Sequence, residues 1–232
     1  MQKQPIGIIG AMRVEVESLL SRMKIKKEEH ISSQTFYVGT LQDVDCVIAQ
    51  CGPGKVNAAI CAQTMILKYN PRLVINSGVA GGIGKGLEIG DLVVAEDCVQ
   101  HDCDTTALGD PPGLVSGINL VKIPCDKEVA EKIQAACHSI YEHTHRGTVV
   151  TGDSFLNDRK KAHELHDLYG AIACEMEGGS IAHVCYMNHV PVTVVRCLSD
   201  KGDDDANFDY PSFVKEAADK LQKLLLSAIQ QI

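Results

Sequence analysis

Two carboxylates and a glycine pair lie at the junction between an apolar segment and a helical one. Glu175 and Glu177 follow a buried strand expected at residues 171–174 and precede Gly178 and Gly179. A carboxylate that close to a core strand is stable only when it is paired, hydrogen-bonded or facing a ligand. Two interpretations stay open from the local sequence: a ligand site, or acidic residues that complement the positive end of the following helix dipole.

An arginine and an aspartate accompany a second apolar segment, residues 192–198. Arg196 lies inside this expected strand, and Asp200 follows shortly after its end. A buried guanidinium requires a carboxylate partner or a ligand. Glu175, Glu177 and Asp200 are the candidate partners if the two strands are neighbours. A purely structural ion pair fits the sequence equally well.

The hydrophobic pattern indicates the elements that must position these groups. Apolar β-branched segments predict strands, and apolar residues at helical spacing predict helices. Strands are expected at residues 6–9, 34–39, 44–49, 72–77, 91–95, 148–151, 171–174 and 192–198. Helices are expected at residues 11–23, 56–68, 127–141, 159–168, 180–185 and 213–232. This alternation predicts an α/β fold, a single three-layer α/β/α domain over residues 1–232 with a mixed, mostly parallel sheet.

Unusual chemistry recurs where the expected strands end. In such sheets ligands bind outside the carboxyl ends of the strands. A glycine-rich loop is expected at 78–84, where backbone N–H groups could approach a ligand or simply form a tight turn. Long and acidic loops are expected at 101–122 and 200–209. The strand-end features that together predict a ligand site are residues 10–15, 78–82, 152–155, 175–177 and 199–200.

Composition restricts the class of protein. The chain has 232 residues, of which 45% are hydrophobic and only 4% aromatic, so an aliphatic core is expected. The net charge of -8 argues against nucleic acid or an anionic membrane surface as a partner. No apolar stretch approaches the roughly 20 residues of a membrane span, and no signal sequence is visible. Ten scattered cysteines are typical of reduced thiols, so a cytoplasmic location is expected.

Cofactor and metal motifs are missing from the sequence. The first glycines do not form GxGxxG, and residues 52–55 and 84–86 lack P-loop spacing, so no nucleotide cofactor is expected. The C-x4-C segment at 98–103 has no second ligand cluster, and the acidic run at 203–205 lacks the pattern of a calcium loop. Neither a metal nor an organic cofactor is expected.

Eight segments together resemble one family. The chain is similar to the 5′-methylthioadenosine/S-adenosylhomocysteine nucleosidases of the nucleoside phosphorylase superfamily. The resemblance covers most of residues 5–213. It rests on IGIIGAM, CGPGKVNAA, INSGVAGG, IGDLVVA, HDCDTTALG, TGDSF, CEMEGGSIAHVC and VVRCLSD.

The resemblance implies a role for each polar residue. Glu15 matches the glutamate that activates water, and Asp200 matches the acid that protonates the purine N7, supported by Ser199. Glu177 matches the carboxylate that holds the ribose hydroxyls, with Met176 against the sugar. An N-glycosidic bond breaks through an oxocarbenium-like state, so the leaving base needs a proton and the cation needs nearby negative charge. Asp200 should therefore have a pKa raised by burial.

Other residues complete the implied site. Phe155 and the backbone of Leu156 match the residues that contact the purine, and Arg196 matches a buried arginine on the sugar side. Val79 replaces a family serine near the phosphate position of phosphorylases, which favours water as the nucleophile. An apolar 5′ pocket is expected from Met12, Leu108, Tyr210 and Phe213. The full set of expected substrate-binding residues is Met12, Val79, Ala80, Gly81, Leu108, Phe155, Leu156, Glu175, Met176, Glu177, Arg196, Ser199 and Tyr210.

The resemblance also implies a homodimer in which Leu108 lies near the partner's site. The expected function is hydrolysis of 5′-methylthioadenosine and S-adenosylhomocysteine to adenine and the 5′-thioribose. Three alternatives remain open from the sequence: a purine nucleoside phosphorylase, an aminofutalosine-type nucleoside hydrolase, and a nucleoside-binding protein without catalytic activity.

Overall fold

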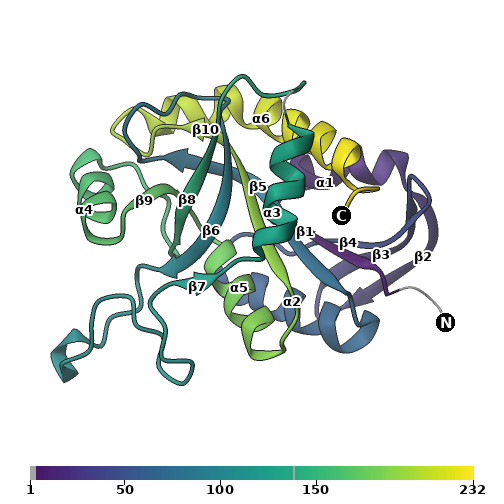
Figure 1. The fold of residues 1–232 in the computed structure, drawn as a ribbon, viewed down its shortest axis with the longest axis horizontal. Coiled ribbons are helices and arrows are strands. Elements are labelled where there is room, and N and C mark those ends of the chain that lie inside the picture. Colours follow the sequence, from purple (N-terminus) through teal and green to yellow (C-terminus); the bar gives the residue numbers. More distant parts are fainter. Residues whose placement is uncertain (1–3, 138) are drawn as a thin grey trace.

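A mixed sheet runs through the whole molecule in the computed structural model, which describes residues 4–137 and 139–232 (Figure 1). The strands are β1 (Ile6–Gly10), β2 (Lys24–Ile31), β3 (Gln34–Leu41), β4 (Val44–Gln50), β5 (Leu73–Gly82), β6 (Leu92–Gln100), β7 (Ile123–Pro124), β8 (Thr144–Thr151), β9 (Ala171–Glu175) and β10 (Val192–Asp200). The helices are α1 (Arg13–Arg22), α2 (Lys55–Tyr69), α3 (Lys127–Ala136), α4 (Arg159–Tyr169), α5 (Gly178–Met187) and α6 (Ala206–Ala228), with a 3₁₀ turn at Thr106–Leu108.

Half of the sheet closes on itself. β5 pairs with β10, β10 with β6, β6 with β8, β8 with β9, and β9 returns to β5. The remaining strands extend from β5 in the order β1, β4, β3 and β2. Within the ring, Gly81 lies opposite both Cys174 of β9 and Asp200 of β10. The closed ring therefore brings the ends of β5, β9 and β10 to one place.

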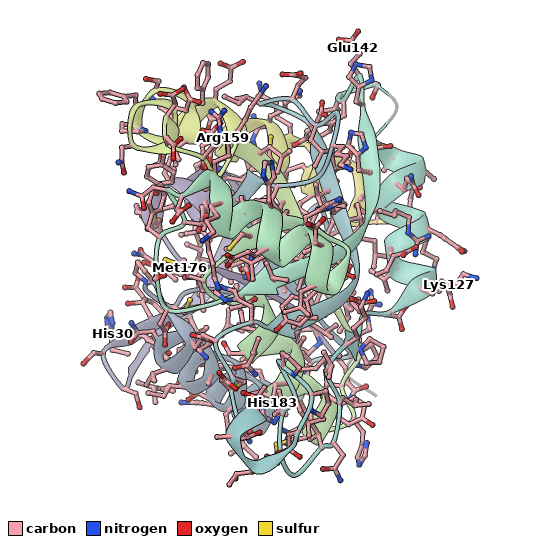
Figure 2. The ribbon with its side chains drawn as sticks, turned by 90° about the vertical axis from the view of Figure 1, so that its left-hand side faces the viewer. His30, Lys127, Glu142, Arg159, Met176 and His183 are labelled. Carbon is pink, nitrogen blue, oxygen red and sulfur yellow. The ribbon has the colours of Figure 1, made fainter. Side chains whose placement is uncertain are left out.

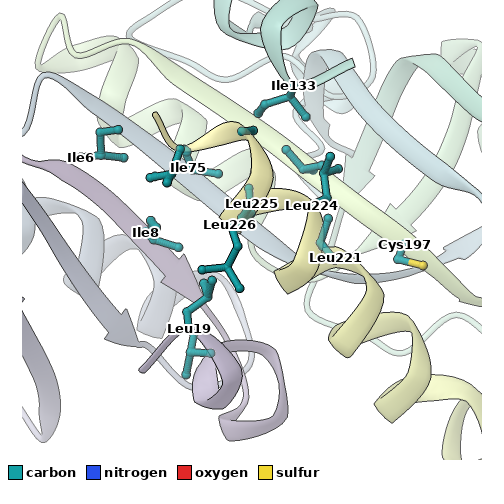
Figure 3. Close-up of a cluster of buried hydrophobic side chains, with 14 of the residues drawn as sticks. Ile6, Ile8, Leu19, Ile75, Ile133, Cys197, Leu221, Leu224, Leu225 and Leu226 are labelled. Atoms are coloured by element: carbon teal, nitrogen blue, oxygen red, sulfur yellow. The ribbon is translucent and has the colours of Figure 1, made fainter. Parts of the chain in front are cut away.

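Helices cover the sheet on two sides. α1, α3 and α6 share one buried apolar cluster with the strands, and α2 and α5 pack together in a second cluster (Figure 1). Figure 3 shows leucines of α6 close to Leu19 of α1 and Ile75 of β5 in the first cluster. Its side chains are almost entirely aliphatic, as expected from the composition. The α/β fold with a central mixed sheet is confirmed, although parallel and antiparallel pairings are equally frequent among the described strands.

Two of the expected loops are regular structure. Residues 78–82 continue β5 as fully buried strand, because their small side chains let β9 and β10 pair closely on either side. α6 begins at Ala206, seven residues before the predicted start, and Pro211 lies inside its second turn. Acidic residues directly before it, at 203–205, complement the helix dipole. The predictions of a glycine-rich loop and of an acidic loop extending to 209 were wrong.

Other boundaries also differ from the expectations. The exposed strand β2 was missed, because its KIKKEEHI sequence lacks the alternation of a strand with one buried face. α3 ends at Ala136 rather than at residue 141, and β8 begins at residue 144 rather than 148. No helix in the described part of the chain is both long and apolar enough to cross a membrane.

Candidate active site

A cavity of about 200 Å³ opens where β5, β9 and β10 end and α1 begins. Glu15, Glu177 and Asp200 all line this cavity, so the three acidic groups singled out from the sequence face one space. Met176 also lines it; in Figure 2 this residue lies between Arg159 above and His30 below. The complete lining is Ala11, Met12, Glu15, Pro53, Val79, Ala80, Gly81, Phe155, Cys174, Glu175, Met176, Glu177, Ser199, Asp200 and Tyr210.

Glu15 is held by backbone amides on three sides. It occupies the third position of α1, and its Oε2 accepts hydrogen bonds from the N–H groups of Ala11 at 2.7 Å and Met12 at 2.9 Å. Its Oε1 accepts a third from the N–H of Val79 at 3.0 Å. Burial raises the pKa of Glu15, and the amide of Met12 and the charge of Arg196 oppose that shift. The carboxyl group is thus fixed in place and titrates above the ordinary glutamate range.

Glu177 stands at the start of α5 and faces the cavity. Its Oε1 accepts a hydrogen bond from the N–H of Gly54 at 2.8 Å, which joins the turn before α2 to the site. Burial raises the pKa of Glu177 to about 8, and the neighbouring charge of Glu175 adds to the shift. The remaining lone pairs of this carboxyl group are available to a ligand.

Asp200 ends β10 beside Ser199. Its Oδ2 accepts a hydrogen bond from the Ser199 hydroxyl at 2.9 Å, and its Oδ1 accepts one from the N–H of Gly202 at 2.9 Å. Burial raises the pKa of Asp200 and outweighs both hydrogen bonds, which favour the charged form. The direction of this shift is the one expected from the sequence.

Glu175 differs from the other three acidic residues because its oxygens are occupied. Its Oε1 accepts from the Thr151 hydroxyl, and its Oε2 accepts from Arg196 and from the N–H of Gly178 at 2.7 Å. Both side chains of the ion pair are buried. Arg196 also donates to the Asn76 side chain, and it lies outside the cavity lining. The sequence left the carboxylate partner of Arg196 undecided, and the structure shows that it is Glu175, which also lines the cavity.

An apolar wall faces the acidic groups. The Tyr210 hydroxyl contacts the sulfur of Met12 at 3.0 Å, and the rings of Tyr210 and Phe155 meet edge to face with centroids 5.5 Å apart. Leu156 lines a smaller adjoining cavity of about 30 Å³, together with Phe155, Met176 and Asp200. The acidic and apolar surfaces could together hold a ligand that has hydroxyl groups at one part and an aromatic ring at another.

Two expected residues lie away from the cavity. Leu108 is 83% exposed in the loop between β6 and β7 and does not line the cavity of its own chain. Phe213 lines a separate surface groove on α6 together with Leu198. Its expected place in the 5′ pocket was wrong, because the earlier start of α6 puts Tyr210, and not Phe213, at the cavity.

Comparison with known proteins agrees with this geometry. Residues 5–230 match the family described as the phosphorylase superfamily. A 5′-methylthioadenosine/S-adenosylhomocysteine nucleosidase of an Exiguobacterium species is 37% identical over 98% of each chain. The crystal structure of the Neisseria meningitidis nucleosidase of that name, in complex with methylthio-immucillin-A, is 31% identical with a TM-score of 0.95, over 99% of this chain and 100% of the other.

The chain belongs to the 5′-methylthioadenosine/S-adenosylhomocysteine nucleosidase family of the phosphorylase superfamily. The family resemblance seen in the sequence is confirmed. The fold also matches the futalosine hydrolase of Helicobacter pylori, 31% identical with a TM-score of 0.93 over 99% of this chain and 98% of the other.

Several groups in this nucleosidase family member were missed from the sequence. Pro53 lines the cavity and the N–H of Gly54 donates to Glu177, although neither residue was expected at the site. Thr151 and Asn76 hold the Glu175–Arg196 pair from neighbouring strands. Both are polar residues at buried strand positions, and that is the one signal that could have identified them.

The potential metal-binding side chains of this family member do not gather into a site within its described residues. No cluster of three or more His, Cys, Asp or Glu side chains in residues 4–137 and 139–232 could hold a metal ion. The four buried carboxyl groups of the site are instead paired with backbone amides, hydroxyls and Arg196.

The raised pKa of Glu177 predicts a pH-dependent stability. A group with a pKa near 4.5 when unfolded and about 8 when folded contributes stability below pH 4.5 and loses it as the pH rises to 8. Glu177→Gln removes this loss. Without ligand, the variant should become progressively more stable relative to the unmodified protein between about pH 5 and 8. Urea unfolding across this range measures it; a constant difference would contradict the shifted pKa.

The buried ion pair predicts strong coupling between its members. Removing one member of a buried pair costs about 3–5 kcal/mol, because it leaves the other charge unpaired. Glu175→Leu should therefore be strongly destabilising, and adding Arg196→Met should recover part of the loss. Denaturant unfolding of the two single variants and the double variant, as a double-mutant cycle, measures the coupling. Additive losses would show that the two charges do not depend on each other.

Proposed function

We propose that this protein is a purine nucleoside hydrolase that cleaves the N-glycosidic bond of 5′-methylthioadenosine and S-adenosylhomocysteine, releasing adenine and the 5′-thioribose. The observation that carries the proposal is the convergence of Glu15, Glu177 and Asp200, each with a raised pKa, on one cavity with an apolar wall. The substrates follow from the names of the relatives at 37% and 31% identity.

Asp200 is the proposed general acid. A raised pKa favours the protonated form of its carboxyl group, and that proton can pass to the purine N7 as the base leaves. Ser199 and the N–H of Gly202 hold the group and stabilise the carboxylate that forms after transfer. A proton donor of this kind typically accelerates a reaction by about 10²–10⁴-fold.

Glu15 is the proposed general base. Its three amide hydrogen bonds occupy both lone pairs of Oε2 and one of Oε1, so one lone pair of Oε1 is left to accept a proton from a water molecule. The buried carboxylate also favours the positive charge that develops on the ribose in an oxocarbenium-like state. Glu15 must lose its proton for both tasks, whereas Asp200 must keep its own.

The other lining residues are proposed to bind the substrate. Glu177 would accept hydrogen bonds from the ribose hydroxyls, with Met176 packed against the sugar. Phe155 would stack on the purine, which the backbone of Leu156 would contact from the adjoining cavity. The thioether at the 5′ position would lie against the apolar surface of Met12 and Tyr210.

Charge favours water over phosphate as the nucleophile. Among the described residues that line the cavity none is a lysine or an arginine, and Val79 offers a backbone N–H that is already bonded to Glu15. The guanidinium of Arg196 does not line the cavity and is paired with Glu175. An incoming phosphate dianion would face several acidic groups without a cation to bind it.

Futalosine-type hydrolysis is the second candidate function. The similarity to the Helicobacter pylori futalosine hydrolase favours it, because the same site could take a nucleoside with another base or 5′ group. A panel of 5′-methylthioadenosine, S-adenosylhomocysteine and aminofutalosine, scored for released base at equal enzyme concentration, would rank the substrates.

We also propose a homodimer and a cytoplasmic location. Apolar side chains on the packed pair α2 and α5 face solvent in the single chain: Val56 is 69% exposed, Leu67 75% and Met187 63%. Such a surface is typical of an interface, and exposed Leu108 could reach the cavity of a second copy.

The proposed cytoplasmic location is supported by ten free cysteines, which include Cys98 and Cys125 with sulfurs 3.9 Å apart.

The acid and base roles predict how two conservative variants behave. Glu15→Gln and Asp200→Asn should each lower kcat by at least about 10²-fold. The test is adenine release in phosphate-free buffer. Wild-type release that requires added phosphate would show a phosphorylase, and wild-type ligand binding without turnover would show a binding protein.

The pH profile checks which residue has which role. In the unmodified protein kcat/KM should fall on the acid side as Glu15 gains a proton, and on the alkaline side as Asp200 loses one. Because both pKa values are raised, the acid limb should lie above the ordinary glutamate value of 4.5. The pH profile of the residual kcat/KM of Glu15→Gln should lack the acid limb. An unchanged acid limb would contradict the assignment of Glu15 as the base.

The dimer proposal predicts complementation between two impaired variants. Leu108→Asp should reduce activity in a homodimer because it alters the partner's cavity, and Glu15→Gln should abolish activity of its own cavity. A mixed dimer contains one cavity with native Glu15 and native Leu108. Mixing the variants should therefore restore activity, with dimers seen by sedimentation velocity. No gain on mixing, or a monomer in sedimentation, would contradict the arrangement.

A further inference from the structure

A buried glutamine joins the last helix to the first. Gln222 of α6 is 0% exposed, and its side-chain amide makes four hydrogen bonds. Its Oε1 accepts from the N–H groups of Ser18 at 2.8 Å and Leu19 at 3.2 Å. Its Nε2 donates to the carbonyl groups of Val14 at 2.9 Å and Ala218 at 3.1 Å. Three of these four partners belong to α1.

The partners in α1 are backbone groups of the helix itself. In an α-helix the carbonyl of one residue pairs with the N–H four residues later, and Val14 and Ser18 have this spacing. The amide of Gln222 presents a donor to the first group and an acceptor to the second. The side chain of Gln222 therefore links two backbone groups one turn apart in α1, where this helix packs against α6.

This turn carries Glu15. The residue lies directly after Val14, its N–H donates to the carbonyl of Met12 at 3.1 Å, and its side chain points away to the cavity. The amides that hold its carboxyl group belong to Ala11, Met12 and Val79, outside the contacts of Gln222. Gln222 thus restrains the backbone of the turn, while other groups hold its carboxyl end.

We infer that Gln222 is a positioning residue for Glu15, which it controls through the first turn of α1 without touching the substrate. The inference rests on the proposed role of Glu15 as the base. A displacement of about 1 Å in a reacting group can cost about 10²-fold in rate. An apolar residue at position 222 would remove the contacts to Val14 and Ser18 and leave the turn free to shift on the surface of α6.

The alternative is that Gln222 only stabilises the packing of two helices. A purely structural role would lower the stability of the variant but leave the turnover of folded molecules unchanged. A positioning role lowers kcat with little change in KM, because Gln222 contacts none of the residues proposed to bind the ribose or the purine. The ratio of the two kinetic effects therefore separates the alternatives.

The test compares Gln222→Met with Leu224→Ala. Methionine keeps the length of the side chain but has neither the amide donor nor its acceptor. Leu224 is fully buried in α6 within the cluster of Figure 3 but makes no hydrogen bond to α1 among those described, so its truncation controls for lost stability. We expect Gln222→Met to lower kcat by at least about 10-fold with KM within about threefold, and Leu224→Ala to keep kcat within about twofold.

The outcomes distinguish this inference from the proposed function. If Gln222→Met keeps its kcat while Glu15→Gln is inactive, the positioning role is overturned and the base role stands. If Glu15→Gln is active, the proposed base role of Glu15 is overturned, and the inference about Gln222 falls with it. Equal losses of kcat in Gln222→Met and Leu224→Ala would show a stability effect only. Should Gln222→Met not fold, Gln222→Glu keeps the acceptor for Ser18 but loses the donor to Val14, and the same kinetic comparison applies.

Discussion

The site depends on one buried cation among four buried carboxyl groups. Arg196 neutralises Glu175 and has no second charge to give to Glu15, Glu177 or Asp200, and the first two feel its field only at a distance. Burial disfavours the charged form of each of these three groups, and the mutual repulsion of several carboxylates adds to that effect. Burial is the largest cause of all three raised pKa values, and repulsion from other carboxylates contributes at Glu177 and Asp200.

This shortage of positive charge suits bond cleavage that creates a cation. A ribose that gains positive charge in the transition state is attracted by the acidic groups of the site. This attraction is greatest when the glycosidic bond is partly broken, so it stabilises the transition state more than the bound substrate. The buried ion pair with Glu175 contributes to this charge distribution, because it neutralises the positive charge of Arg196. A free Arg196 next to Glu15 would lower the pKa of this proposed base and oppose the cationic sugar.

The sequence was most informative where composition conflicts with burial. Charged residues in or next to apolar segments indicated four candidates, each from the local sequence alone: Glu175, Glu177, Arg196 and Asp200. The structure brings these four residues together. Backbone contributions were not predictable in this way. The amides of Val79 and Gly54 are main-chain groups, whose contacts the side-chain type does not reveal. Gln222 lies 204 residues from Ser18, whose N–H donates a hydrogen bond to it. Strand β2 was missed because solvent covers most of its side chains, which removes the periodic signal.

The glycines of β5 show how the acidic groups constrain the sequence of the sheet. A methyl group on Gly78 would lie 2.5 Å from Oε1 of Glu15, and one on Gly81 would lie 2.7 Å from Oδ1 of Asp200. These positions have ordinary strand conformations, so neither glycine is needed for a turn. They are needed because β5 runs directly beneath the proposed acid and base, and only a strand without side chains there lets both carboxyl groups approach it. The close contact that the glycine pattern indicated is thus one between the strand and the protein's own carboxyl groups.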